Sequence, residues 1–94
     1  MGVILLSREP LIIVGKKPII KYVTACITVF NRGERSILLR ARGKRIANCV
    51  DVVNLLKKSF ITNLSIKEII IGTEILKESD KYRYISYIEI RITR

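Results

Sequence analysis

The last thirteen residues of the chain alternate between two kinds of position, and this pattern predicts a long β-strand. From Tyr82 to Arg94 the even-numbered positions carry Ile88, Ile90 and Ile92, whereas most odd-numbered positions are polar or charged. A period of two is typical of a strand with one buried face. Residues 64–76 form a second long segment, dominated by isoleucine, and residues 77–81 between the two are polar. Together they predict a long antiparallel β-hairpin at the end of the chain.

Two shorter strand–helix units precede this hairpin. Residues 11–14 and 36–41 are apolar runs of strand length, and each is followed by glycine and then by apolar residues at helical spacing. Pro18 suits the first turn of a helix, and Gly33 suits the left-handed residue that ends it. The apolar faces of the two expected helices are Ile19, Tyr22, Val23, Cys26, Ile27 and Phe30 in the first, and Ile46, Cys49, Val50, Val53, Leu56 and Phe60 in the second. The expected order is β-α-β-α-β-β, an α+β two-layer sandwich.

Length and composition allow one domain with a genuine core. The chain has 94 residues, of which 49% are hydrophobic, and this excludes a disordered basic tail. We expect residues 1–10 to be a loose N-terminal segment and residues 11–94 to be a single domain. No apolar run reaches the roughly 18 residues that a membrane span requires, and the N-terminus lacks the basic region of a signal peptide. A soluble, cytoplasmic protein without a membrane partner is therefore expected.

The net charge of +10 indicates a polyanionic partner. Residues 1–45 contain ten basic and two acidic side chains, whereas residues 46–94 contain eight basic and six acidic ones. This uneven division predicts that the first half of the chain provides most of the contacts.

Two basic segments lie where an expected strand passes into an expected helix. The first is Gly15-Lys16-Lys17-Pro18, in which two ammonium groups adjoin helix N-terminal amides, an arrangement that favours phosphate. The second runs from Arg40 to Arg45, and Gly43 within it is expected to adopt a positive φ. A solvated surface turn is the alternative for each segment. The candidate phosphate contacts are Lys16, Lys17, Arg40, Arg42, Lys44 and Arg45.

Three further features leave two interpretations open. Lys81 and Arg83, near the tip of the hairpin, belong either to an arm that enters a nucleic-acid groove or to a solvated loop. Tyr22 either packs in the core or directs its hydroxyl at a phosphate. Cys26 and Cys49 are expected to be buried thiols, with a disulfide between the helices as the alternative.

Catalysis and cofactor binding are not expected. The chain has no histidine, its acidic residues are scattered, and its two cysteines lack companion ligands, so neither a catalytic group, a metal site nor a cofactor is indicated. The Gly43-Lys44 pair is followed by Arg45, which rules out a nucleotide-binding P-loop.

Eight segments, in order along residues 11–92, resemble the archaeal Alba family. They are Val14-Gly15-Lys16-Lys17-Pro18, Tyr22-Val23, Asn31-Arg32-Gly33, Arg40-Ala41-Arg42-Gly43-Lys44, Ile46, Val50-Asp51-Val52, Ile71-Gly72-Thr73-Glu74 and Ser86-Tyr87-Ile88-Glu89-Ile90. The chain departs from the family pattern at Arg45, where a small residue is frequent, and at Ala47-Asn48, which replaces a frequent Ser-Lys pair.

The resemblance implies a basic homodimer that binds double-stranded DNA, and also RNA, with little sequence preference. It implies that the protein coats and compacts the archaeal chromosome and is associated with the nucleoid. Lys16, Lys17, Tyr22, Arg42 and Lys44 would be contacts of the body, the hairpins would be arms, and Phe60 would join dimers side by side. A heterodimer with a sister protein is an alternative to the homodimer, and a mainly RNA-binding component of a ribonucleoprotein is the alternative function.

Overall fold

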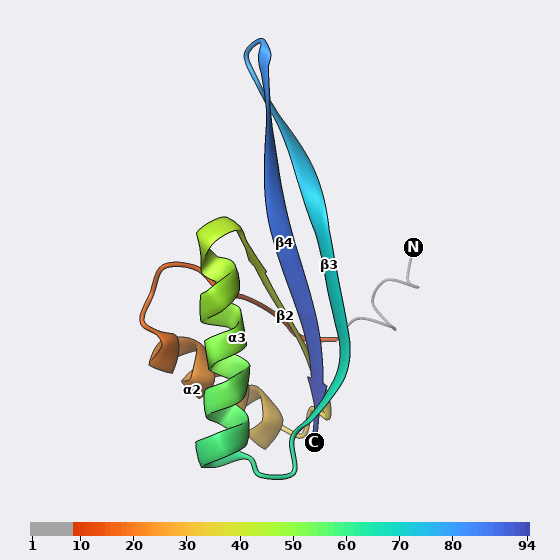
Figure 1. The fold of residues 1–94 in the computed structure, drawn as a ribbon. Coiled ribbons are helices and arrows are strands. Elements are labelled where there is room, and N and C mark those ends of the chain that lie inside the picture. Colours follow the sequence, from red (N-terminus) through yellow and green to blue (C-terminus); the bar gives the residue numbers. More distant parts are fainter. Residues whose placement is uncertain (1–8) are drawn as a thin grey trace.

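The computed structural model describes residues 9–94, which form a four-stranded sheet with two helices on one face (Figure 1). The elements are β1 (Leu11–Ile13), α2 (Ile19–Asn31), β2 (Ser36–Arg42), the 3-10 turn η1 (Gly43–Arg45), α3 (Ile46–Leu55), the π-helical turn η2 (Leu56–Phe60), β3 (Ser65–Glu78) and β4 (Lys81–Thr93). The predicted α+β class and the order β-α-β-α-β-β are confirmed.

The strands lie in the order β1-β2-β4-β3. β1 pairs in parallel with β2, and the other two pairings are antiparallel. Because β1 and β2 run in the same direction, both end at the same edge of the sheet, and each then enters a loop that leads to a helix. β3 and β4 continue far beyond the helices as a two-stranded arm (Figure 1), which extends the longest dimension of the molecule to 46 Å.

The connection at the tip of this arm is shorter than the five polar residues 77–81 suggested. Lys77 pairs with Tyr82 and Glu78 pairs with Lys81, so only Ser79 and Asp80 turn the chain. Ser79, the first of these two residues, has a φ of 53°, as a two-residue hairpin turn with a left-handed first position requires. The polar composition of residues 77–81 predicted a loop, but cross-strand pairing extends β3 to Glu78 and begins β4 at Lys81.

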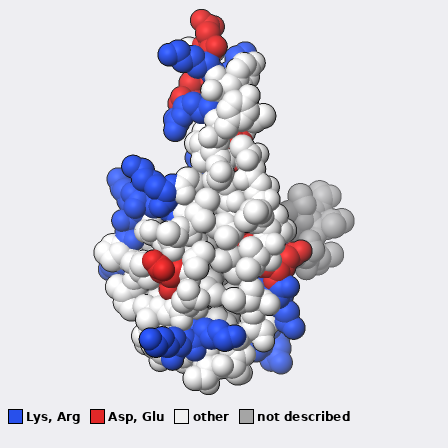
Figure 2. Space-filling view, in the orientation of Figure 1, with Lys and Arg blue, Asp and Glu red and all other residues white. Residues whose placement is uncertain are grey.

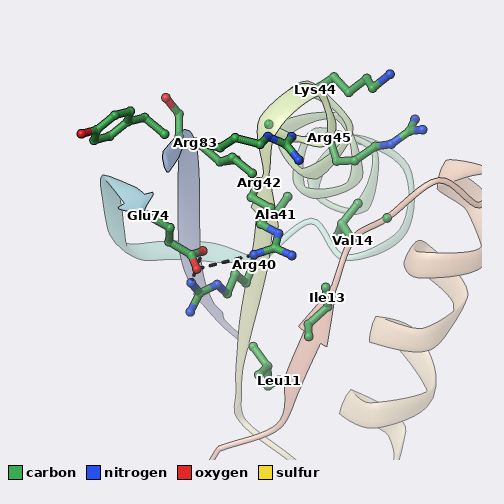
Figure 3. Close-up of a pocket in the computed structure, with 15 residues that line it drawn as sticks. Leu11, Ile13, Val14, Arg40, Ala41, Arg42, Lys44, Arg45, Glu74 and Arg83 are labelled. Atoms are coloured by element: carbon green, nitrogen blue, oxygen red, sulfur yellow. Dashed lines mark hydrogen bonds and ion pairs between the residues drawn. The ribbon is translucent and has the colours of Figure 1, made fainter. Parts of the chain in front are cut away.

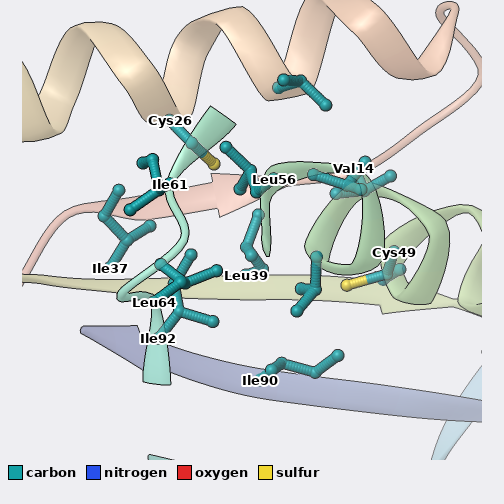
Figure 4. Packing of buried hydrophobic residues seen from close by; sticks show 14 of the residues in the cluster. Val14, Cys26, Ile37, Leu39, Cys49, Leu56, Ile61, Leu64, Ile90 and Ile92 are labelled. Atoms are coloured by element: carbon teal, nitrogen blue, oxygen red, sulfur yellow. The ribbon is translucent and has the colours of Figure 1, made fainter. Parts of the chain in front are cut away.

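The core lies between the helices and one face of the sheet, and every buried side chain in residues 9–94 is hydrophobic (Figure 4). The sheet contributes alternate residues, as the period of two predicted: Ile37, Leu39 and Ala41 from β2, and Ile88, Ile90 and Ile92 from β4. The predicted face of α2 is also confirmed, since Val23, Cys26 and Phe30 are buried.

The predicted face of α3 needs one correction. Cys49, Val53 and Leu56 are buried as expected, but Val52 is buried with them, whereas Val50 is 37% exposed and Phe60 is 50% exposed. A helix that buries positions 49, 52, 53 and 56 turns position 50 toward solvent. The last turn then widens into η2, where the Ile61 N–H donates to the Leu56 carbonyl at 2.7 Å.

Both helix-flanking glycines adopt the left-handed backbone that the sequence predicted. Gly33, just after α2, has a φ of 101°, and Gly43, at the end of β2, has a φ of 60°. A side chain at either position would strain the backbone.

Two residues of the segment expected to be loose are attached to the sheet. The Glu9 carboxylate accepts hydrogen bonds from Ser36 Oγ at 2.5 Å and from Arg91 Nε at 2.8 Å. The Pro10 carbonyl accepts from the Leu38 N–H at 2.9 Å. The rest of that segment, residues 1–8, lies outside the described residues. No helix within residues 9–94 is long and apolar enough to cross a membrane.

Cys26 and Cys49 are free thiols, both fully buried, as the sequence indicated. Burial raises the pKa of Cys26 to about 12 and that of Cys49 to about 11.

We therefore predict that iodoacetamide at pH 8 leaves both thiols unmodified in the native protein and alkylates both after denaturation, because a buried, protonated thiol is a poor nucleophile. Mass spectrometry gives the readout. Rapid native alkylation, or a mass lower by two hydrogen atoms, would contradict this assignment.

Candidate nucleic-acid interface

Parallel pairing brings the two basic loops together at one edge of the sheet. The first loop joins β1 to α2 and contains Lys16 and Lys17, and the second joins β2 to α3 through η1. The Val14 N–H donates to the Arg40 carbonyl at 2.8 Å, which ties the start of one loop to the end of the neighbouring strand. The expectation that both segments occupy equivalent strand-to-helix positions is therefore confirmed.

The first loop is held in shape by Tyr22. The Tyr22 hydroxyl oxygen accepts hydrogen bonds from the Gly15 N–H at 2.9 Å and from the Lys17 N–H at 3.2 Å. The half-buried ring packs against the core, while the hydroxyl lies under the loop. The ring therefore packs as the core interpretation expects. Contact between the Tyr22 hydroxyl and a phosphate stays a prediction, for which the two accepted bonds leave the phenolic proton available.

The N-terminus of α2 adds a positive field to this loop. It has neither a side-chain cap nor an acidic residue in its first turn. The Lys21 N–H donates to the Pro18 carbonyl at 2.9 Å. The positive end of the helix dipole therefore adjoins the exposed Lys16 and Lys17 side chains without a compensating acidic group in the first turn.

The second loop borders an open groove of about 990 Å³ (Figure 3). Its apolar floor includes Leu11, Ile13 and Val14, and Tyr84 and Ile85 of β4 form part of its wall. The charged residues that line it are Arg40, Arg42, Lys44, Arg45, Arg83 and Glu74. Five of the predicted contacts therefore meet at one groove, which Gly15 of the first loop also lines.

Arg40 differs from the other basic residues because its charge is already matched. Its guanidinium donates to Glu74 at 2.7 Å and to Glu89 at 3.0 Å, and it lies 5.0 Å from the centre of the Tyr87 ring. The hydrogen bond to Glu74 raises the pKa of Arg40 above its usual value. Arg40 therefore organises the sheet face beside the groove.

Arg42 shares Glu74 more loosely. Its nearest guanidinium nitrogen lies 3.5 Å from the other carboxylate oxygen, and its side chain is 54% exposed. Figure 3 shows Glu74 joined to two guanidinium groups, those of Arg40 and Arg42. Glu74 thus restrains Arg42 at the groove and leaves most of its donors free.

This network rests on a close approach between two strands that the sequence did not reveal. Gly72 lies directly opposite Tyr87, and the tyrosine ring covers the glycine: a β-carbon at Gly72 would lie 2.6 Å from Tyr87 Oη and 2.7 Å from Cζ. Alternation along each strand indicates which residues share a face, but only the cross-strand register shows that Gly72, Tyr87 and Arg40 are neighbours. Glu74, Tyr87 and Glu89 were missed as members of the site for this reason.

Lys81 and Phe60 lie away from the groove. Lys81 is at the tip of the arm. Arg83 lines the groove and also lies 3.4 Å from Glu78. Phe60 ends η2 at the opposite end of the body. No group of three Cys, Asp or Glu side chains in residues 9–94 is arranged to hold a metal ion.

The basic residues of the first half of the chain do not share one side. Lys16, Lys17 and Arg42–Arg45 lie near the groove, but Arg32 and Arg35 lie between α2 and β2, at the other end of the body. Figure 2 shows basic side chains at both ends. The excess of basic side chains in residues 1–45 therefore does not correspond to one face of the molecule.

We predict that Gly72→Ala destabilises the protein by about 1–3 kcal/mol, because the new methyl group displaces the Tyr87 ring and Arg40 with it. Chemical denaturation measures the loss. Thr73→Ala, an exposed neighbour on the same strand, is the matched control. In a Tyr87→Ala background, Gly72→Ala should cost little; an equal cost in both backgrounds would rule out the ring as the cause.

Comparison with known proteins agrees with this geometry. Residues 11–73 match the Alba family model. The chain is 38% identical over 89 residues to the DNA/RNA-binding protein Alba of Thermoplasma volcanium, which covers 95% of this chain and 100% of that protein. It is 35% identical over 86 residues to DNA/RNA-binding protein Alba 1 of Archaeoglobus fulgidus, covering 92% of this chain and 97% of that protein.

Solved structures show the same fold. Alba from Thermoplasma volcanium superposes with a TM-score of 0.84 at 39% identity, covering 89% of this chain and 99% of that one. ALBA1 from Trypanosoma brucei shares the fold with a TM-score of 0.74 at 23% identity, covering 93% and 72%. The family match spans both basic loops, β1, β2 and the part of β3 that contains Gly72, and the chain belongs to the Alba family.

Proposed function

We propose that this protein is a non-enzymatic, sequence-nonspecific binder of double-stranded DNA that coats and compacts the chromosome in the cytoplasm, and that it also binds RNA. The observation that carries the proposal is the pair of adjacent strand-to-helix loops, which present Lys16, Lys17, Arg42 and Lys44 beside one groove. Relatives named DNA/RNA-binding proteins support the same class of partner.

Contacts at this surface are directed at phosphates rather than at bases. Lysine and arginine provide affinity for the backbone, whereas asparagine and glutamine pair with adenine edges. Neither loop contains asparagine, and the chain has no glutamine. In our proposal Lys16 and Lys17 act as mobile charges, Arg42, Lys44 and Arg45 bind phosphate oxygens, and the Tyr22 phenolic proton donates to a further phosphate. Arg40 acts through Arg42, which shares its Glu74 partner.

The arm extends the contact to a neighbouring part of the nucleic acid. A two-stranded ribbon fits a groove of a duplex, and Lys81 and Arg83 would provide its charges. Tyr82 and Tyr84 are 59% and 70% exposed on the other side of the ribbon. Exposed tyrosines stack on unpaired bases, so these two residues favour RNA as a second ligand and a ribonucleoprotein role as the alternative function.

A second copy of the chain is the proposed partner for an apolar strip along the stem of the arm. Ile69, Ile71 and Ile75 project from the helix-side face of β3, opposite Ile90, Ile88 and Tyr84 of β4. Ile71 is 76% exposed and Ile75 is 61% exposed. The other face of the sheet carries the ion pairs of Arg40 and Arg91, whose desolvation would oppose a close contact.

The strip therefore suits a two-fold homodimer, with a heterodimer with a sister protein using the same surface as the alternative. Phe60, half exposed at the far end of α3, would join dimers side by side on DNA.

The salt dependence of binding tests the proposed function. If each protomer of a dimer neutralises about three phosphates, log affinity for a duplex should fall against log salt with a slope of about −5. Lys16→Ala with Lys17→Ala removes about four of these contacts per dimer and should flatten the slope to about −2. Fluorescence anisotropy with several unrelated duplexes measures both values.

Arg32→Ala with Arg35→Ala, which removes the same charge at the far end of the body, is the control and should retain the parental slope for a single short duplex. Binding that is insensitive to salt, or that favours one sequence by orders of magnitude, would refute the proposal. Competition between matched DNA and RNA duplexes decides which polymer is preferred.

Association through the strip is tested by Ile71→Asp, which should convert the dimer to a monomer in analytical ultracentrifugation because it would bury an unpaired carboxylate. Ile13→Asp places the same charge on another exposed isoleucine, 66% exposed on the opposite face of the sheet, and should remain dimeric. A monomeric parent, or dissociation by Ile13→Asp but not by Ile71→Asp, would contradict this interface. Circular dichroism confirms that both variants are folded.

A further inference from the structure

The groove beside the second loop has an exposed apolar floor in addition to its basic residues. Leu11 and Ile13 of β1 line it and are 52% and 66% exposed. Ile12 between them packs against the core, so the alternation of a strand places its two neighbours on the open face of the sheet. They therefore belong neither to the core nor to the apolar strip on the helix side of β3.

The ion pairs of Arg40 leave this floor uncovered. Ile13 lies beside Arg40 in the register of β1 with β2. The Arg40 guanidinium, however, is bound by Glu74 of β3 and Glu89 of β4. Because the strand order is β1-β2-β4-β3, these partners draw the long arginine side chain away from β1. Arg40 therefore does not shield the isoleucine from solvent.

Positive charge gathers at one end of the groove. Arg42, Lys44 and Arg45 follow one another at the end of β2 and in η1. Figure 3 shows their side chains toward the upper end of the view, whereas Leu11 and Ile13 lie lower down. The groove thus has a cationic end and an apolar floor. This arrangement is complementary to a ligand that has an anionic end and an uncharged, apolar body.

A phosphate backbone that runs along the floor does not meet this requirement. A phosphate placed over Leu11 and Ile13 would lose water without gaining a polar partner. Glu74, the only acidic residue among the described residues that line the groove, would also repel it. A nucleobase is uncharged and has an apolar face, and apolar side chains pack against bases that have left the stack of a duplex.

The size of the groove and the cost of unstacking define the kind of base. Its volume of about 990 Å³ lies within the range of roughly 300–1,000 Å³ of sites for small organic molecules, so a nucleotide can enter. Removing a base from a paired stack costs a few kcal/mol, and this cost is least for a base that is already unpaired. The groove therefore suits a base from a bulge, a loop or a strand end.

We propose that the groove binds one unpaired base of a nucleic acid, with the base on Leu11 and Ile13 and its phosphate on Arg42 and Lys44. This inference rests on the proposed function and adds to it a preference for strands with unpaired nucleotides. The loop of Lys16 and Lys17 would hold the backbone of the flanking duplex. Salt weakens phosphate contacts in paired and bulged duplexes alike, whereas it does not screen an apolar contact, so the preference should persist at high salt.

Three duplexes of otherwise equal sequence test this inference: one fully paired, one with a single bulged adenosine, and one with an abasic nucleotide at the bulge. The abasic duplex keeps the phosphates and the flexibility of the bulge and lacks only the base. Fluorescence anisotropy at low and at high salt measures the three affinities. The parent should bind the bulged adenosine about five-fold more tightly than the abasic bulge at both salt concentrations, because only the base buries apolar surface.

Substitutions on the floor should change this ratio and leave binding of the paired duplex nearly unaltered. Leu11→Ala/Ile13→Ala should lower the ratio below about two-fold, and Ile13→Tyr, which enlarges the stacking surface, should raise it. Ile70→Ala is the matched control, because Ile70 is 38% exposed on the open face of β3 and lies outside the groove. It should keep the parental ratio. An unchanged ratio in both floor variants would overturn the proposal.

A fluorescent base gives a direct readout. 2-Aminopurine at the bulge should brighten when the parent binds, because the base leaves its stacked neighbours, and should brighten less with Leu11→Ala/Ile13→Ala.

Other occupants of the groove give distinct results. Competition by free adenosine monophosphate at the concentration of the bulged duplex would overturn the proposal in favour of a small-molecule site. A higher affinity for the bulged duplex after removal of residues 2–7 would overturn it in favour of the chain's own N-terminal segment. Equal binding of bulged and abasic duplexes by the parent would overturn it and leave the proposed function intact. Failure of the parent to bind any duplex would instead refute the proposed function.

Discussion

The parallel pairing of β1 with β2 is the interaction on which the candidate interface depends. β1 has only three residues, yet its alignment with β2 makes two loops distant in sequence leave the sheet at the same edge. An antiparallel β1 would send Lys16 and Lys17 to the other end of β2, away from Arg42 and Lys44. The core supports this pairing from the helix side, since α2 and α3 cover β1 and β2 with wholly apolar side chains.

The charges of the protein fall into two groups with different physical roles. Arg40 and Arg91 are matched by two glutamates each on the open face of the sheet, where they order the strands and the groove wall. Four of the loop cations, namely Lys16, Lys17, Lys44 and Arg45, form no ion pair among residues 9–94, and Arg42 shares Glu74 only at 3.5 Å. These five residues provide the field that attracts a polyanion. Net charge counts both groups equally, and only the contacts distinguish them.

Much of the fold could be predicted because it follows from local periodicity. Alternation identified the buried face of β4, and Gly33 and Gly43 were recognised as the residues able to adopt a positive φ. Prediction failed where position depended on long-range contacts. In the sequence Val50 and Phe60 fit the apolar stripe of a helix. In the structure the helix packs on the sheet through Cys49, Val52, Val53 and Leu56, so Val50 and Phe60 are exposed. The polar composition of residues 77–81 suggested a loop, but cross-strand pairing extends both strands into that region.

The candidate site also combines features that the sequence shows with features that depend on the fold. The sequence by itself determined the charge that a partner meets: ten more basic than acidic side chains, two strand-to-helix loops rich in lysine and arginine, and no histidine. Only the tertiary structure decided which of these cations are free. Strand register brings Glu74 and Glu89 onto Arg40, and the fold carries Arg32 and Arg35 to the end opposite the loops that precede and follow them in sequence. The physical reason is that charge is a property of each residue, whereas its neutralisation depends on distances of a few ångströms between residues far apart in the chain.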